Sequence, residues 1–137
     1  MGLILDSSVV IASERLGQTA YQMLEAISHQ KADPEIAISV ITVLELAHGI
    51  THANTPQRRA GRQQFLDDLL AGMPVHPITI AIALRAEQTD GQMQPAGKRI
   101  ALADLLIGST ALELGYSVAT TNVRHFAMIP DLVIEQL

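Results

Sequence analysis

Leu3-Ile4-Leu5-Asp6-Ser7-Ser8-Val9-Val10-Ile11 joins two short apolar runs through one acid and two hydroxyl residues. The run at 3–5 is typical of a buried strand, and it ends at Asp6. A hydroxyl at Ser7 or Ser8 can cap a short helix through 9–11, because it accepts from a backbone amide that the helix leaves unpaired. This stretch therefore predicts a strand followed at once by a helix.

The same alternation recurs along the rest of the chain. Further strands are expected at 36–38, 75–78, 118–120 and 132–134, and the stretch at 75–78 has the weakest pattern because prolines flank it. Helices are expected at 20–31, from Ser39 to about 50, from Thr55-Pro56 to 72, from Thr79 toward 88, and at 101–114, with a loop at 92–98. Strand–helix alternation predicts a parallel sheet with helices on both faces.

Length and composition predict one domain that spans 1–137. The 137 residues are 48% hydrophobic and include no cysteine, which excludes disulfides, zinc–thiolate sites, iron–sulfur clusters and thiol catalysis. No apolar run approaches the roughly 20 residues that a membrane span needs. No basic start precedes the run at 3–5, so we expect no signal peptide, no membrane association and a cytoplasmic location.

The charge balance restricts how the protein could handle nucleic acid. Nine basic residues stand against fourteen acidic residues, and the formal net charge is −5. This balance argues against a sequence-independent grip on phosphates, which depends on clustered lysine and arginine. Aromatic residues are only 3% of the chain, so a base-stacking platform is not expected either. Any action on nucleic acid would depend on a local site.

Polar residues follow the predicted strands within otherwise apolar sequence. Asp6 follows the first strand, Glu45 lies about two turns into the helix after the second, Asp104 is in the first turn of the helix at 101–114, and Asn122 follows the fourth strand. Working sites of parallel sheets lie outside the carboxyl ends of the strands. Each residue alone is also compatible with a structural role, such as a helix cap, a favourable position on the helix dipole or a surface position.

Taken together, these residues predict a metal site. Carboxylates that are buried close together repel one another unless they are protonated or bound to a cation. Oxygen ligands of high negative charge select Mg²⁺ or Mn²⁺ rather than zinc. Such a cation polarises a phosphoryl oxygen and lowers the pKa of bound water, so phosphodiester hydrolysis is the expected chemistry.

Four blocks of sequence carry a resemblance to a known family. They are LDSSVVIA (5–12), SVITVLEL (39–46), IALADLLIG (100–108) and ATTNVRHF (119–126). In this order and at these separations they resemble PIN-domain ribonucleases, specifically the VapC-type toxins of type II toxin–antitoxin pairs. The resemblance covers nearly the whole chain, although each block alone is a weak signal.

The resemblance implies a three-layer α/β/α sandwich with a central, mostly parallel sheet of four to five strands. It also implies a Mg²⁺ or Mn²⁺ site, endoribonuclease activity on RNA, a homodimer and inhibition by a VapB-like antitoxin. By position, Asp6, Glu45 and Asp104 would be the catalytic, metal-coordinating acids, and Ser8, Thr120 and Asn122 would support them through hydrogen bonds. Asn122 stands where many PIN domains have a fourth acid. Because an amide adds no charge, the resemblance does not decide whether a second metal ion binds.

Two other functional classes stay open. One is a catalytically silent PIN-fold module that binds protein. The other is a phosphoacceptor α/β domain. Haloacid-dehalogenase-like folds need an Asp-x-Asp pattern, but Ser8 stands at its second position here. Receiver-like domains need a late lysine, but no lysine follows Lys98.

Basic and histidine residues carry further hypotheses. Candidate RNA-binding residues are Arg58, Arg59, Arg62, Lys98, Arg99 and Arg124, and the alternative for each is a solvated surface position. His48 and His52 have the spacing of a zinc pair, but the H-E-x-x-H pattern is absent, so we interpret His48 as a neighbour of Glu45. We interpret His125 as a structural residue rather than a general base.

Overall fold

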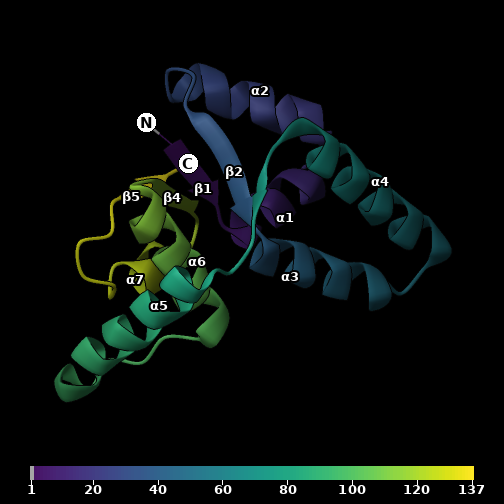
Figure 1. Ribbon diagram of the computed structural model, residues 1–137. Helices are drawn as coiled ribbons and strands as arrows, with labels where there is room; N and C mark the ends of the chain where they lie inside the picture. Colours follow the sequence, from purple (N-terminus) through teal and green to yellow (C-terminus); the bar gives the residue numbers. More distant parts are fainter. Residues whose placement is uncertain (1) are drawn as a thin grey trace.

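Five strands form one parallel sheet in the computed structural model, which describes residues 2–137 (Figure 1). In spatial order they are β3 (Val75–His76), β2 (Glu35–Ser39), β1 (Gly2–Leu5), β4 (Ser117–Thr120) and β5 (Ile134–Gln136). Every neighbouring pair is parallel. β1 lies at the centre, where Leu3 is in register with Ile36 of β2 and with Ser117 of β4. The carboxyl ends of the strands therefore share one edge of the sheet.

Seven α-helices connect and cover these strands within residues 2–137. They are α1 (Ser7–Arg15), α2 (Ala20–Gln30), α3 (Val40–Thr51), α4 (Pro56–Gly72), α5 (Ile80–Met93), α6 (Leu102–Leu114) and α7 (Val123–Phe126). A 3₁₀ turn, Gln94–Ala96, follows α5. Helices lie on both faces of the sheet, which confirms the predicted three-layer α/β/α sandwich (Figure 1). No helix within residues 2–137 is both long and apolar enough to cross a membrane.

Alternation along the strands builds the two hydrophobic cores. Successive side chains of a strand point to opposite faces, so Leu3 and Leu5 pack on one face and Ile4 packs on the other. The first core also takes side chains from α1, α2 and α4, whereas the second takes them from α6, α7 and Met93 at the end of α5. Because the strands are covered on both faces, they appear in the sequence as short, uninterrupted apolar runs.

Most helix boundaries are set by the residues that the sequence suggests. The Ser39 hydroxyl accepts from the amide of Ile41 at 3.0 Å at the start of α3, and the Thr55 hydroxyl accepts from the amide of Arg58 at 3.1 Å at the start of α4. α6 ends at Gly115, whose φ of 70° lies in the left-handed region that glycine adopts without strain. These caps fix where α3 and α4 begin and where α6 ends.

Several local predictions were wrong. The N-cap of α1 is Asp6 rather than a serine, and no side chain caps this helix; the Ser7 and Ser8 hydroxyls bind carboxylates instead. α5 continues to Met93, beyond the expected end near 88, and a 3₁₀ turn occupies part of the expected loop. The short helix α7 was not predicted. The last strand is Ile134–Gln136 rather than 132–134, because residues 134–136 supply the pairing with β4.

Candidate active site

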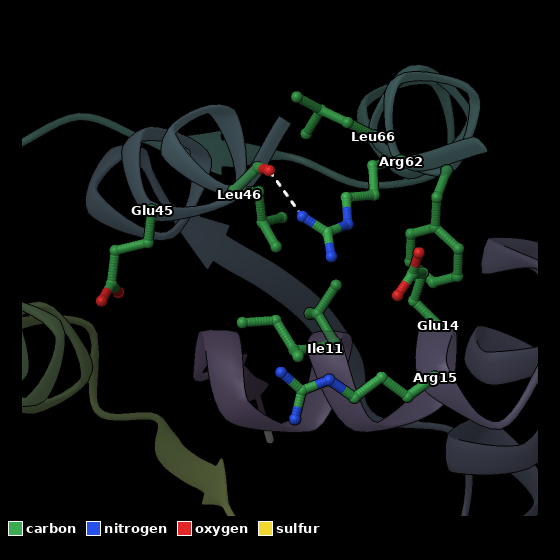
Figure 2. A pocket seen from close by; sticks show the side chains of 10 residues that line it. Ile11, Glu14, Arg15, Glu45, Leu46, Arg62 and Leu66 are labelled. Atoms are coloured by element: carbon green, nitrogen blue, oxygen red, sulfur yellow. Dashed lines mark hydrogen bonds between the residues drawn. The ribbon is translucent and has the colours of Figure 1, made fainter. Parts of the chain in front are cut away.

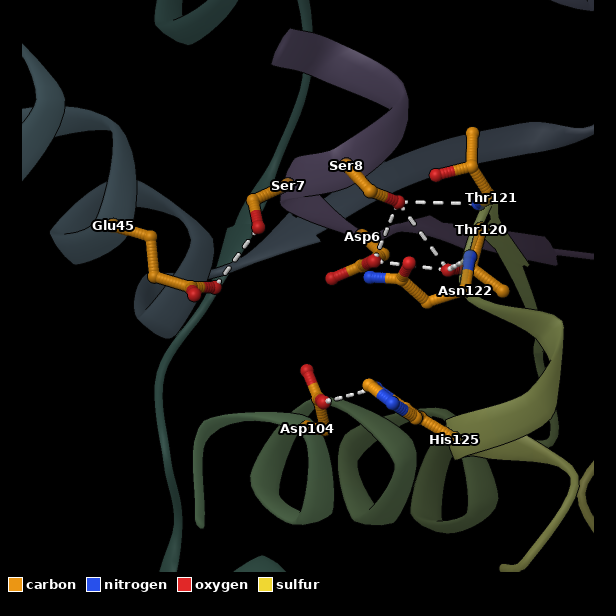
Figure 3. A network of polar contacts seen from close by, with 9 residues as sticks. All are labelled: Asp6, Ser7, Ser8, Glu45, Asp104, Thr120, Thr121, Asn122 and His125. Atoms are coloured by element: carbon orange, nitrogen blue, oxygen red, sulfur yellow. Dashed lines mark hydrogen bonds and ion pairs between the residues drawn. The ribbon is translucent and has the colours of Figure 1, made fainter. Parts of the chain in front are cut away.

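Asp6, Glu45 and Asp104 converge at the carboxyl edge of the sheet. Asp6 follows β1 directly, Glu45 projects from α3, and Asp104 lies in the first turn of α6. Figure 3 shows the three carboxylates pointing into one shared space. The sequence prediction that these acids, 98 positions apart at the extremes, form one cluster is consistent with this arrangement.

The Asp6 carboxylate is held by hydrogen bonds from the start of α1 and from the end of β4. Its Oδ2 accepts hydrogen bonds from the Ser8 hydroxyl at 2.7 Å and from the Thr120 hydroxyl at 2.9 Å. Thr120 in turn accepts from the backbone amide of Asn122 at 2.9 Å, and Ser8 accepts from that of Thr121 at 3.1 Å. Asp6 is only 2% exposed. The network fixes its carboxylate and ties the loop after β4 to the start of α1.

The Glu45 and Asp104 carboxylates receive fewer hydrogen bonds than the Asp6 carboxylate. The Ser7 hydroxyl donates to Oε1 of Glu45 at 3.1 Å. Burial raises the pKa of Glu45, the negative charges of Asp6 and Asp104 add to this rise, and the Ser7 hydrogen bond opposes it. Burial likewise raises the pKa of Asp104, and the charge of Asp6 adds to it. Both carboxyl groups therefore become charged less readily than a free side chain.

His125 lies at the site rather than in the core. Its Nδ1 is 3.6 Å from Oδ2 of Asp104, a distance of ion-pair contact that is too long for a hydrogen bond. The His125 side chain is 57% exposed, whereas that of Asp104 is 16% exposed. The interpretation of His125 as a structural residue is therefore not supported by its position. Its sequence neighbourhood, the ATTNVRHF block, is the signal that could have placed it at the site.

The donor set fits a hard divalent cation. All three acids offer oxygen, and two of them have carboxyl groups whose ionisation is opposed by burial and by their neighbours, a cost that a bound cation would offset. Within residues 2–137, no three histidine, aspartate or glutamate side chains enclose a metal position directly. Mg²⁺ suits such an open set, because it usually keeps several of its waters and takes only one or two carboxylates.

Histidines on α3 do not support a zinc site. The rings of His48 and His52 stack with centroids 4.0 Å apart, and Nδ1 of His52 lies 2.9 Å from the backbone carbonyl of His48. No third ligand completes the pair within the described part of the chain. Stacking and helix-end capping account for the spacing.

The predicted RNA-binding residues do not form a single surface. Arg58 and Arg62 are engaged on α4: Arg58 donates to the Asn54 side chain at 2.9 Å, and Arg62 donates to the Gly49 carbonyl at 2.6 Å. Arg59 and Arg124 are exposed, on α4 and α7 respectively. Lys98 and Arg99 are exposed on the segment before α6. Asn122 is exposed next to Asp6, with its side chain near the shared space (Figure 3).

A groove of about 140 Å³ opens beside Glu45, between α1, α3 and α4 (Figure 2). Its lining is mostly apolar and comes from Val10, Ile11, Leu46, Phe65 and Leu66, with Gly49. Glu14, Arg15 and Arg62 supply charge along it, and the Arg62 bond to Gly49 joins α4 to α3 within it. This groove could not be predicted from the sequence, because its lining residues come from three separate helices.

A known protein family and several known proteins resemble this chain in sequence. The sequence profile of the PIN domain matches residues 3–132. The chain therefore belongs to the PIN domain family. This PIN domain is 36% identical over 130 residues to Ribonuclease VapC10 of Mycobacterium tuberculosis. The aligned region covers 95% of this chain and 90% of that protein. It is 29% identical over 134 residues to Ribonuclease VapC1 of Rickettsia felis, with coverage of 98% and 95%.

Solved structures agree on the fold of the PIN domain. VapBC2 from Rickettsia felis, bound to a DNA fragment from its promoter, matches with a TM-score of 0.85 at 23% identity, over 100% of this chain and 99% of the other. DNA-bound VapBC from Salmonella typhimurium matches with a TM-score of 0.82 at 22% identity, over 99% and 98%. The resemblance to VapC-type proteins that the four sequence blocks suggested is thus confirmed.

Proposed function

We propose that this PIN domain is a Mg²⁺- or Mn²⁺-dependent endoribonuclease that acts as the toxin of a toxin–antitoxin pair. The observation that carries the proposal is the convergence of Asp6, Glu45 and Asp104 at one sheet edge, with ionisation of Glu45 and Asp104 opposed by their surroundings. The ribonuclease names of its relatives support RNA as the substrate. Cellular RNA also gives the reason for proposing a cytoplasmic location.

The side chains would divide the work as follows. Asp6, Glu45 and Asp104 would hold the cation, which would supply activation of water and polarisation of the phosphate. Ser8 and Thr120 keep the Asp6 carboxylate in place. The Asn122 side chain, next to Asp6, adds a neutral amide and no charge. The exposed cations Arg59, Lys98, Arg99 and Arg124 are proposed to contact RNA phosphates around the site.

An RNA-cleavage assay tests the proposal. Purified protein is incubated with RNA fragments in Mn²⁺, in Mg²⁺ and in EDTA, alongside Asp104→Asn. The exposed Asp67→Asn on α4 is the matched control, because it removes one negative charge away from the site. Cleavage that needs metal, is lost in Asp104→Asn and persists in Asp67→Asn supports the proposal. A wild-type protein that binds its partner but cuts no RNA would instead favour the catalytically silent module.

The phosphoacceptor alternative is disfavoured by the surroundings of Asp6. A phosphoacceptor carboxylate has to be open to the incoming phosphoryl group, whereas Asp6 is 2% exposed and is held by two hydroxyls. Membership of the PIN domain family argues in the same direction.

We further propose a VapB-like antitoxin as partner, because the structural neighbours are VapBC complexes. A segment of this partner would fill the groove of Figure 2, or place a basic side chain among the three acids. The apolar lining and the Arg15 and Arg62 side chains suit an amphipathic segment with acidic residues. The charge reversal Arg15→Glu should weaken copurification of the partner and relieve its inhibition of RNA cleavage. Full activity of the saturated complex would contradict this inhibitory role.

A homodimer is the proposed assembly. Large apolar side chains are exposed in pairs four residues apart, and thus on one helix face: Val40 and Leu44 on α3, and Ile80 and Leu84 on α5. Leu102, at the start of α6, is 69% exposed. Covering such side chains is a common reason for association. Light scattering should show a dimer that Leu84→Glu dissociates, whereas a wild-type monomer would contradict it.

A further inference from the structure

Ser7 and Ser8 are consecutive, yet their hydroxyls serve different acids. Ser8 donates to Asp6, which lies two positions before it. Ser7 donates at 3.1 Å to Oε1 of Glu45, which lies 38 positions away on α3 (Figure 3). Ser7 is 8% exposed, and within residues 2–137 its hydroxyl has no other hydrogen-bond partner. This contact is therefore a cross-link between α1, which directly follows Asp6, and α3, which carries Glu45.

We propose that Ser7 is a positioning residue for Glu45, which it holds through Oε1 so that the carboxylate faces Asp6 and Asp104. The inference rests on the proposed function. Glutamate has three side-chain torsions, so a half-buried glutamate with no fixed partner samples several orientations. Ser7 has one torsion, and its backbone is fixed in the first turn of α1 directly after β1. The hydrogen bond thus restrains the flexible Glu45 side chain, on α3, relative to the edge of the sheet.

The surroundings of Glu45 make this contact more than a surface hydrogen bond. Hydrogen bonds to a charged acceptor are about twice as strong as those between neutral groups, and more so where water is partly excluded. Glu45 is partly buried and shares its space with Asp6 and Asp104, and within residues 2–137 the Ser7 hydroxyl is the one hydrogen-bond donor to its carboxylate. The bond therefore holds the carboxylate where water competes less for it.

The decisive measurement is the affinity of the purified protein for Mn²⁺, followed by the electron paramagnetic resonance of free Mn²⁺. Outer partners of ligating carboxylates typically contribute about 10- to 100-fold to metal affinity. We therefore expect Ser7→Ala to bind Mn²⁺ at least about 10-fold more weakly than wild type. Ser7→Thr keeps a hydroxyl and should restore most of the affinity.

Ser13→Ala is the matched control, because Ser13 lies on the same helix and its hydroxyl makes no hydrogen bond within the described residues. This variant should bind Mn²⁺ as wild type does. Thermal unfolding without metal should show that both variants fold, with the lower midpoint for Ser7→Ala, because only this variant loses a hydrogen bond. A purely structural role of Ser7 predicts the same lowered midpoint together with an unchanged Mn²⁺ affinity.

The possible outcomes separate the inference from the proposed function. Wild-type affinity in folded Ser7→Ala overturns the role of Ser7 and leaves the proposed function intact. Absence of Mn²⁺ binding by wild type, with or without an RNA oligonucleotide, overturns both. Should Ser7→Ala not fold, Ser7→Cys takes its place, because a thiol is of similar size but a weak donor. Wild-type affinity in Ser7→Cys then overturns the inference, and weakened affinity supports it.

Discussion

Asp6 differs sharply from Glu45 and Asp104, although all three carboxylates face the same space. Asp6 is 2% exposed, sits between two strand ends and receives two hydroxyl hydrogen bonds on one oxygen. Glu45 receives one hydroxyl, and Asp104 has only an ion-pair contact with a largely exposed histidine. Burial raises the pKa of both Glu45 and Asp104.

This contrast suggests that the fold compensates the charge of Asp6 with its own hydrogen-bond donors. Glu45 and Asp104 would need a bound cation for the same compensation. The Asp6 network belongs to the sheet, because it links the end of β1 to the end of β4. Glu45 and Asp104 are brought in by helices from the two sides of the cluster. We therefore expect Asp6 to matter for both stability and activity, and the other two to matter for activity at some cost to stability.

The largest effect should come from Glu45→Gln. The substitution keeps the shape of the side chain and its contact with Ser7 but removes the charge. Because loss of a ligand should exceed the 10- to 100-fold loss typical of outer partners, RNA cleavage should fall by more than about 100-fold. Initial rates at several Mn²⁺ concentrations measure this. A fall of less than about 10-fold would remove Glu45 from the cation site.

The next effect is stabilisation by the cation. Mn²⁺ at 100 times its dissociation constant should raise the free energy of unfolding by about 2.7 kcal/mol. Asp104→Asn should lose this gain, while Asp67→Asn, an exposed control on α4, should keep it. Urea unfolding with and without Mn²⁺ provides the comparison. A metal-dependent gain that survives in Asp104→Asn would place the cation elsewhere.

Substitution of the acids without metal should separate the two environments directly. Asp6→Ala leaves the Ser8 and Thr120 hydroxyls without their acceptor, and Thr120 is fully buried. This should lower the free energy of unfolding by about 1–3 kcal/mol. Asp104→Asn should raise it instead, because it relieves repulsion with Asp6. If both substitutions destabilise the protein equally, the distinction between a satisfied and an unsatisfied acid is wrong.

The sequence predicted the central strands and the three acids because their signals are local. Apolar runs, capping hydroxyls and the acids that follow strands can all be recognised within a few residues. The helix α7 was missed because four residues cannot show a helical period. The last strand was placed two residues too early, since the apolar pair at 132–133 precedes the pairing segment. The domain limits and the roles of the acids stay predictions.

The roles of Ser7 and His125 could not be predicted for a different reason. Each depends on a contact with a residue that is distant in the sequence: Glu45 for Ser7, and Asp104 for His125. In the sequence, Ser7 has the pattern of a helix cap and His125 precedes an apolar residue. Only the crossing of α1 with α3, and of α7 with α6, brings these side chains to the acids.

The smallest effect should be the pH dependence of stability without metal. The pKa of Asp104 is raised above its ordinary value of 3.8, and that of Glu45 above 4.5, so the folded state binds more protons than the unfolded state in this range. Stability from these two groups is therefore fully present below the ordinary values and is lost as pH rises through the raised pKa values.

Other carboxylates also titrate in this range and obscure the trend in wild type alone. The useful quantity is therefore the difference in free energy of unfolding between Asp104→Asn and wild type. Urea unfolding across a pH series should show the variant gaining stability relative to wild type as pH rises through the raised pKa of Asp104, and then levelling off. Burial of the Asp104 carboxyl makes the largest contribution to this gain, the charge of Asp6 adds to it, and the contact with His125 opposes it. Asp67→Asn should show no such rise. A difference that is flat with pH would mean that Asp104 ionises as freely as an exposed acid, and the contrast with Asp6 would then rest on hydrogen bonding alone.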